Sequence, residues 1–177
     1  VTVHEKSGFD RHQHLDYQMI YVESGAYQAS VNGTKMELGP EDLLVVKPFD
    51  WHEEHCLPPL RYYAVNFVLA ETVERSQQSE ESLGLFREGI APLEQVAQIA
   101  AATMQPLLNQ LMEEANRSDA LSPALQDGIL SQMVLTALRE FPDRCLREGL
   151  LAQGPDEHFL LRLERMFRQN ARHGVSV

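Results

Sequence analysis

Apolar and polar residues alternate with a period of two over the first part of the chain, from Val1 to about Ala70, in short runs rich in Val, Tyr and Ile. Such alternation is typical of β-strands that bury one face. The runs predict strands at residues 15–22, 26–31, 35–38, 42–46, 52–56 and 62–69. Many short strands separated by turn signals indicate a sandwich, a jelly roll or a barrel.

Turn-forming residues separate these runs. The pair Asn32-Gly33 lies between two of the predicted strands. A type I′ hairpin turn needs a positive φ at both of its central residues, which Asn and Gly tolerate. Gly25 and the pair Gly39-Pro40 mark two further bends. The sequence therefore predicts a β-hairpin centred on Asn32-Gly33.

The apolar period becomes helical in the second half of the chain. Apolar residues at helical spacing, with Leu107 and Leu111 among them, predict a long amphipathic helix over residues 92–115. Pro106 lies inside this run. Because proline interrupts helical hydrogen bonding, we expect a kink or a helix boundary near Gln105.

Two more helices follow in the pattern. Ser122 is a residue type that caps helices, and Pro123 suits the first helical turn, so a second helix is predicted over residues 123–141. A third is predicted over residues 156–172. Its basic residues, which we interpret as a solvated face, are Arg162, Arg165, Arg168 and Arg172.

Residues 71–91 are mostly polar and predict a connector between the two parts of the chain. We therefore expect a mainly β fold with appended helices. Its parts are a barrel domain over residues 1–70, the connector, and a helical region over residues 92–177.

The predicted helices also imply a partner. The apolar stripe of residues 92–115 is longer than one face of a small barrel needs. We therefore expect a second copy of the chain to cover part of it. The predicted homodimer forms through the helices at 92–115 and 123–141, with Leu107 and Leu111 at the contact.

The chain has 177 residues, of which 44% are hydrophobic and 23% are charged, as expected of one soluble domain or two small ones. No apolar run reaches the roughly 20 residues that a membrane span needs, and the first residues do not resemble a signal peptide. We therefore expect a cytoplasmic protein with no membrane contact. The net charge of −11 argues against nucleic-acid binding by this chain alone. Cys56 and Cys145 form no CxxC pair and are expected to be reduced core residues.

Histidines stand near the start of the predicted strands. If the chain is extended here, His12, His14 and Gln18 share one face, because side chains alternate along a strand. His52 follows an apolar run and a proline turn and offers a third imidazole. Three neutral imidazoles and an amide oxygen suit a divalent transition ion such as Zn, Fe, Mn or Ni. The same side chains would also serve as polar groups of a metal-free pocket, or as hydrogen-bonded residues in a turn and at strand ends.

Aromatic residues in the strands offer the apolar wall that a pocket for a small organic effector needs. The residues that we place beside the histidines as ligand-binding candidates are Tyr21, Trp51, Tyr63 and Phe67. Tyr17 and Tyr62 are further aromatic candidates, and all of these side chains would equally serve as core. Glu53, Glu54 and His55 follow His52 and offer a further ligand or a carboxylate that orients a histidine, although we expect them to be mostly solvated.

The spacing of these residues resembles that of cupin proteins. The residues that match the first cupin motif are Gly8, His12, His14, Gln18 and Gly25. That motif usually has glutamate in place of Gln18, so a metal would lose one compensating charge here. The stretch from Glu41 to His52, with Pro48 near the turn, is similar to the second cupin motif, whose usual first glycine is Glu41 in this chain. The resemblance implies a jelly-roll barrel with the histidines and Gln18 facing a common interior.

The order of motifs more narrowly resembles the N-terminal sensing domain of AraC-family transcription regulators. The HxH pair is followed by a strand, a glycine, a hairpin, the run EDLL, a proline, His52, a further strand and long helices. In that family a cupin barrel binds a small effector, helices behind it form the dimer contact, and a C-terminal helix-turn-helix domain binds DNA. The final stretch, FRQNARHGVSV, resembles the linker toward that domain. The resemblance thus implies DNA binding only through a domain absent from this chain.

Three functions are consistent with these patterns. The first is an effector-sensing and dimerisation domain of an AraC-type regulator, which is not an enzyme. The second is a cupin metalloenzyme of the dioxygenase or isomerase type, with its metal on the same histidines and Gln18. The third is an oligomerisation unit alone. The sequence favours the first, because it accounts for the barrel, the long helices and the final stretch together.

Overall fold

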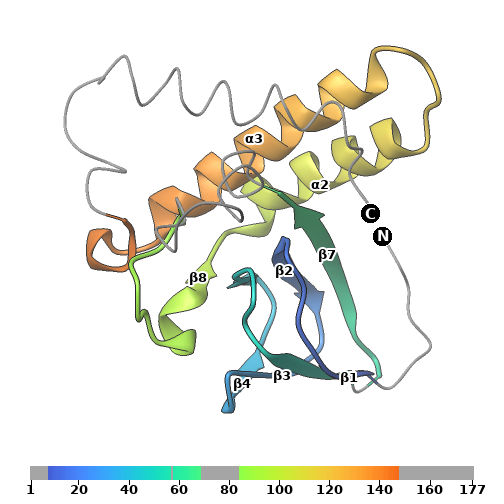
Figure 1. Cartoon of the computed structure of the whole chain (residues 1–177). Helices are drawn as coiled ribbons and strands as arrows, with labels where there is room; N and C mark the ends of the chain where they lie inside the picture. The colour runs from blue at the N-terminus through green and yellow to red at the C-terminus, as the bar shows by residue number, and fades with distance from the viewer. Residues whose placement is uncertain (1–7, 57, 69–83, 148–177) are drawn as a thin grey trace.

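The computed structural model describes residues 8–56, 58–68 and 84–147. The predicted third helix at 156–172, with its four arginines, and most of the predicted connector lie outside the described residues. Figure 1 shows two helices that lie side by side next to a group of short strands. Neither of these helices is long and apolar enough to cross a membrane.

The strands of the described residues form two four-stranded antiparallel sheets. The first sheet, in spatial order, consists of β1 (Gly8–His12), β6 (His52–Cys56), β3 (Tyr27–Val31) and β4 (Thr34–Leu38). The second consists of β7 (Arg61–Phe67), β2 (Tyr17–Ser24), β5 (Asp42–Val46) and β8 (Val96–Gln98). Because the chain passes back and forth between the sheets, they form a jelly roll, which confirms the predicted cupin-like fold.

The strands predicted from the alternation are all present, close to their predicted bounds. The hairpin is also confirmed, because Asn32 has a φ of 49° and Gly33 a φ of 83° between the paired residues Val31 and Thr34. Two short edge strands, β1 and β8, were not predicted. β8 has only three residues, and β1, with the sequence GFDRH, is mostly polar, so neither shows a clear alternation of apolar residues.

Alternate residues of β2 face two separate cores. Ile20 and Val22 lie in the core between the two sheets. Met19 and Tyr21 pack in a second core that also contains residues of the helices. The helices therefore cover the outer face of the second sheet, and the space between the sheets is the jelly-roll interior.

The helix predicted over residues 92–115 is wrong in its first part. Pro92–Gln95 form a short 3₁₀ turn, η1, and Val96–Gln98 then pair with β5 as β8. The α-helix α2 spans only Ala101–Ala115. The side chain of Gln95 is fully buried, so the chain is fixed to the barrel before the helix begins.

Pro106 lies inside α2 without ending it. It removes one helical hydrogen bond, and the packing of the apolar stripe holds the helix together. That stripe faces the molecule's own core, since Leu107 is 7% exposed and Leu111 is 1% exposed. The prediction that these two leucines form the dimer contact is therefore wrong.

Helix α3 spans Ser122–Glu140, close to its predicted bounds, but Ser122 is not its cap. The Oδ1 atom of Asp119 accepts hydrogen bonds from the backbone N–H groups of Leu121, at 2.8 Å, and Ser122, at 3.1 Å. The bond from Leu121 is the main reason that the pKa of Asp119 is lowered. An upstream aspartate thus satisfies the free N–H groups that the serine was expected to cap.

The part of the predicted polar connector that the structure describes, residues 84–91, contains apolar side chains that pack in the core. Leu85 and Phe86 are both buried, and the Phe86 ring packs edge-on against Phe141 at 5.0 Å between centroids. The N–H of Leu85 donates to the Tyr17 hydroxyl at 3.1 Å. These residues belong to the core that joins the helices to the barrel.

The two cysteines are free and buried, as predicted.

Asp127, on α3, is buried, and one of its carboxyl oxygens has no hydrogen-bond partner among the described residues. Burial raises the pKa of Asp127 to about 6. The folded chain therefore holds a proton that the unfolded chain releases at lower pH, so stability falls as the pH rises through the folded pKa. We expect Asp127→Asn to raise the free energy of unfolding by about 1–2 kcal/mol near pH 8 and to change it little near pH 4. Urea denaturation at both pH values measures this effect, and an equal effect at both would contradict the assignment.

Candidate metal centre

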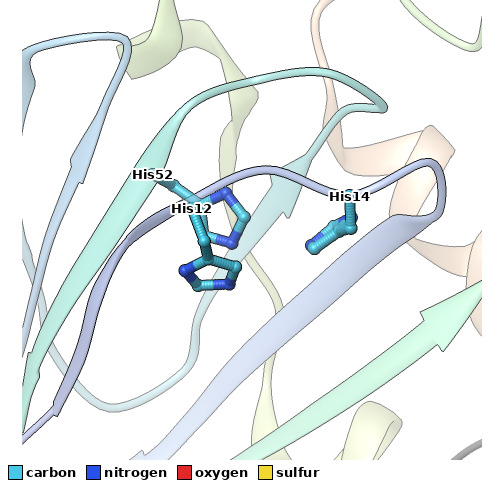
Figure 2. Close-up of side chains that lie close together, drawn as sticks. All are labelled: His12, His14 and His52. Atoms are coloured by element: carbon cyan, nitrogen blue, oxygen red, sulfur yellow. The ribbon is translucent and has the colours of Figure 1, made fainter.

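Three imidazoles meet at one end of the jelly roll: His12 at the end of β1, His14 in the following loop, and His52 at the start of β6 (Figure 2). One ring nitrogen from each lies within 4.8 Å of those from the other two. The ring centroids are 4.1 Å apart for His12 and His52, and 4.8 Å apart for His14 and His52. The structure thus brings together all three histidines that the sequence singles out.

A bulge in β1 turns His12 toward the interior. Between Phe9 and His12 the register against β6 shifts, so that His12 pairs directly with His52. An extra residue in one strand re-aims the side chains that follow it. The expectation of one continuous strand through His12 and Gln18 is wrong, because β1 ends at His12 and β2 begins at Tyr17 in the opposite sheet.

The loop that carries His14 is hydrogen-bonded to the β5–β6 loop, which leads into His52. The N–H of Phe49, in the β5–β6 loop, donates to the carbonyl oxygen of His14 at 2.9 Å. Asn32 ties the same loop to the β3–β4 hairpin: its Nδ2 donates to Asp50 Oδ1 at 2.8 Å, and its Oδ1 accepts from the N–H of Trp51 at 3.0 Å. The relative position of His14 and His52 is therefore held by hydrogen bonds from both sides.

Each imidazole has its Nδ1 atom next to a backbone carbonyl oxygen. The partners are Asp10 at 2.8 Å for His12, Asp16 at 2.8 Å for His14, and Asp50 at 3.0 Å for His52. Because a carbonyl oxygen only accepts, these contacts assign the proton to Nδ1 and leave a lone pair on Nε2. Metal-bound histidines use this arrangement, in which an outer partner fixes the ring and its tautomer.

The Nε2 atoms of His14 and His52 are buried and have no hydrogen-bond partner among the described residues. Buried polar atoms are normally paired, so these two lone pairs are available to a metal ion or to another hydrogen-bonding group. Burial is the main reason that the pKa of His52 is lowered. A lowered pKa keeps the imidazole neutral, which is the form that binds metal.

Gln18 offers an oxygen at the same end of the interior. It is the second residue of β2 and shares the interior face with Ile20 and Val22, which lie in the core between the sheets. Its Oε1 atom is buried without a hydrogen-bond partner among the described residues. Three imidazoles and this oxygen fit a divalent transition ion.

The family of the chain follows from a comparison with known families. A model of the AraC-like ligand binding domain matches residues 3–134. The chain belongs to this family. The resemblance found in the sequence is thereby confirmed, and the jelly roll is the ligand-binding barrel of an AraC-like domain. A search of curated proteins found no match.

A search of the solved structures gave partial matches to this AraC-like domain. KdgF from Halomonas sp. is 29% identical over 32% of this chain and 53% of its own, with a TM-score of 0.30. The ribosomal oxygenase YcfD from Escherichia coli is 18% identical over 69% of this chain and 39% of its own, with a TM-score of 0.33. A YcfD structure in complex with cobalt and succinic acid gives a TM-score of 0.34. The chain thus spans about half the length of KdgF and less of YcfD.

Glu54, which the sequence offers as a further ligand or as a carboxylate that orients a histidine, is a buried residue of the AraC-like domain. It is 4% exposed, although it was expected to be solvated. On β6 the side chains of His52, Glu54 and Cys56 are buried, while that of His55 is exposed. Burial raises the pKa of Glu54, and the neighbouring Tyr27 and His12 act in the opposite direction. Counting alternate positions from His52 would have placed this carboxyl inside the barrel.

The predicted aromatic wall is not assembled beside the histidines. Three of the four predicted aromatic residues pack instead in the core against the helices, namely Tyr21, Tyr63 and Phe67. The hydroxyl of Tyr21 donates to the Ile99 carbonyl at 3.1 Å, and Phe67 stacks on Tyr17 with ring centroids 5.3 Å apart.

The fourth predicted aromatic, Trp51, is 42% exposed, with the Arg11 guanidinium 5.0 Å from its ring centroid. The rings that pack against the core between the sheets are Tyr27 and Tyr62, 4.9 Å apart. The error has a simple physical cause. In a strand buried on both faces, aromatic residues occur on either face, and composition alone does not tell which face is the ligand side.

Proposed function

We propose that this AraC-like domain senses a small-molecule effector for a transcription regulator. The effector binds in the jelly roll and controls DNA binding by a C-terminal domain outside this chain. We propose that His12, His14, His52 and Gln18 anchor it by holding a divalent transition ion, with Zn, Fe, Mn and Ni as the candidates. The family match supports ligand binding. The observation that carries the metal proposal is the pair of buried, unpaired Nε2 atoms on His14 and His52, which have no partner among the described residues.

The residues at this centre have different roles. The imidazoles supply neutral nitrogen ligands, and the carbonyls of Asp10, Asp16 and Asp50 hold the rings in the required tautomer. A bound ion supplies open coordination positions for oxygen or nitrogen atoms of the effector.

Two glutamates link the barrel to α2. The Oε1 atom of Glu41 accepts the N–H of Ala101, in the first turn of α2, at 2.8 Å. Glu23, at the end of β2, accepts a hydrogen bond from Gln105 of α2 and pairs with Arg61 of β7 at 2.8 Å. A ligand changes such an assembly only through a difference in affinity between two states. We propose that these hydrogen bonds transmit the effect of ligand binding from the barrel to the helices.

We propose that the domain forms a homodimer through its helices. Because Leu107 and Leu111 are core residues, the contact falls on the outer side of α3. The large apolar residues exposed there are Leu121, Leu125 and Leu135, at 71%, 48% and 39%. Exposed apolar residues on one helix are typical of a helix–helix interface.

A cupin metalloenzyme is the second candidate function. It is favoured by one observation, the buried carboxyl of Glu54 on the same strand face as His52. A carboxyl whose pKa is raised by burial next to a metal centre is a suitable general base. Turnover by this domain that is lost in Glu54→Gln would establish the enzyme and contradict a role as a sensor alone.

Trp51 provides the test of the metal proposal. It is the single tryptophan of the chain and directly precedes His52. Binding of Co²⁺ to tag-free protein is expected to quench its fluorescence in a saturable way, because open-shell ions quench indoles at short range. Zn²⁺ at about 100 times its dissociation constant is expected to stabilise the fold by about 2.7 kcal/mol. Linear, unsaturable quenching and an unchanged melting temperature would contradict the proposal.

A further inference from the structure

Three large apolar side chains are exposed on residues that neighbour the histidines in the chain or are hydrogen-bonded to them through the backbone. They are Leu15, Phe49 and Trp51, with exposed fractions of 67%, 60% and 42%. Leu15 follows His14 in the chain, Trp51 precedes His52, and the N–H of Phe49 donates to the carbonyl of His14. We call these three residues the apolar rim. The other large apolar side chains exposed among the described residues lie on η1 or at α3.

Phe49 is unusual in two independent respects. Its φ of 65° lies in the left-handed region, which is unfavourable for a bulky L-residue. Its side chain is exposed, so no burial in the core compensates for the backbone conformation. The other non-glycine residues with positive φ among those described have evident roles, since Asn32 forms the hairpin turn and Glu41 bonds to α2. A strained, exposed aromatic residue beside a polar centre indicates a binding role.

From these observations we infer that the effector is amphipathic. Its polar end carries oxygen atoms that coordinate the metal ion at the histidine centre. Its apolar end lies on the rim of Leu15, Phe49 and Trp51. The Arg11 guanidinium lies 5.0 Å from the centroid of the Trp51 ring, at cation–π distance. The inference rests on the proposed function, because it takes the histidine centre as the anchor. It excludes small polar effectors that would leave the rim uncovered.

Two probes with the same metal-binding end test the inference. Acetohydroxamate and benzohydroxamate bind metals through the same two oxygens and differ in the apolar part. On Co²⁺-loaded protein, calorimetry is expected to show benzohydroxamate binding about tenfold more tightly. In the double variant Leu15→Ser, Phe49→Asn the preference is expected to fall below about threefold, with the affinity for acetohydroxamate unchanged. Asn tolerates the left-handed region, so this variant keeps the loop.

The control is Leu93→Ser, which removes a leucine that is 60% exposed on η1 and is expected to keep the full preference. Equal affinity for the two probes in the wild type, or an unchanged preference in the double variant, would overturn the inference. Binding of Co²⁺ is measured before the probes are added. If Co²⁺ does not bind, the proposed metal centre fails and the inference falls with it; if it binds without a preference for benzohydroxamate, only the inference fails.

Discussion

Replacing Leu111 with glutamate is expected to abolish the folded state. Leu111 is 1% exposed in the core that joins α2, α3 and the second sheet. A glutamate at this position would place an unpaired charge among apolar side chains, which costs more than about 4 kcal/mol and is comparable to the whole stability of a domain. Circular dichroism and analytical ultracentrifugation of Leu111→Glu should show an unfolded or aggregated chain. A soluble, folded monomer would restore Leu111 to the dimer contact and contradict the packing described here.

The matched variant carries the same change on the outer side of α3. Leu125 and Leu135 are 48% and 39% exposed, so Leu125→Glu with Leu135→Glu is expected to leave the chain folded. Sedimentation velocity should then give half the mass of the wild type. A wild type that already sediments as a monomer, or a variant that remains a dimer, would refute the proposed interface.

Replacing His52 with alanine is expected to weaken metal binding by roughly a hundredfold or more, because even the loss of an outer partner of a metal ligand costs about 10–100-fold. His52 is the most buried of the three histidines, at 2% exposed, and its Nε2 has no other partner among the described residues. The quenching of Trp51 by Co²⁺ measures the loss. Without metal, the variant should still fold, because Asp50 remains bonded to Asn32 and Lys47.

His55→Ala is the control for this prediction. His55 lies on the same strand, further along β6, but its side chain is exposed on the outer face. Removing it tests whether any histidine on β6 affects the metal. An affinity loss in His55→Ala equal to that in His52→Ala would show that the ion binds nonspecifically to surface histidines.

The strands of the barrel could be predicted because their apolar residues alternate over enough positions to be recognised. β5 and β6 have the predicted bounds, and the Asn32-Gly33 turn has the expected positive φ values. β8 could not be predicted in the same way. Its three residues follow Pro92, whose surroundings have a helical apolar spacing, and tertiary packing of Gln95 against the barrel overrides that local pattern.

The three histidines of the candidate site could be singled out from the sequence, but the way in which the chain brings them together could not. His12 reaches the centre through a bulge, and His14 from a loop, although one extended strand was assumed. Neither feature has a signal in a single sequence, because a bulge depends on the pairing with β6. The aromatic prediction failed for a related reason. Tyr21 and Gln18 lie on opposite faces of β2, and only the placement of the helices decides which face encloses the ligand.

We propose that the histidines of the jelly roll hold a metal ion for the effector. Equilibrium dialysis of tag-free protein against Zn²⁺, followed by metal analysis, tests it most directly. We predict one ion per chain for the wild type and for His55→Ala, and none for His52→Ala at the same free Zn²⁺ concentration. A wild type that retains no ion, or a His52→Ala variant that still retains one, would contradict the claim.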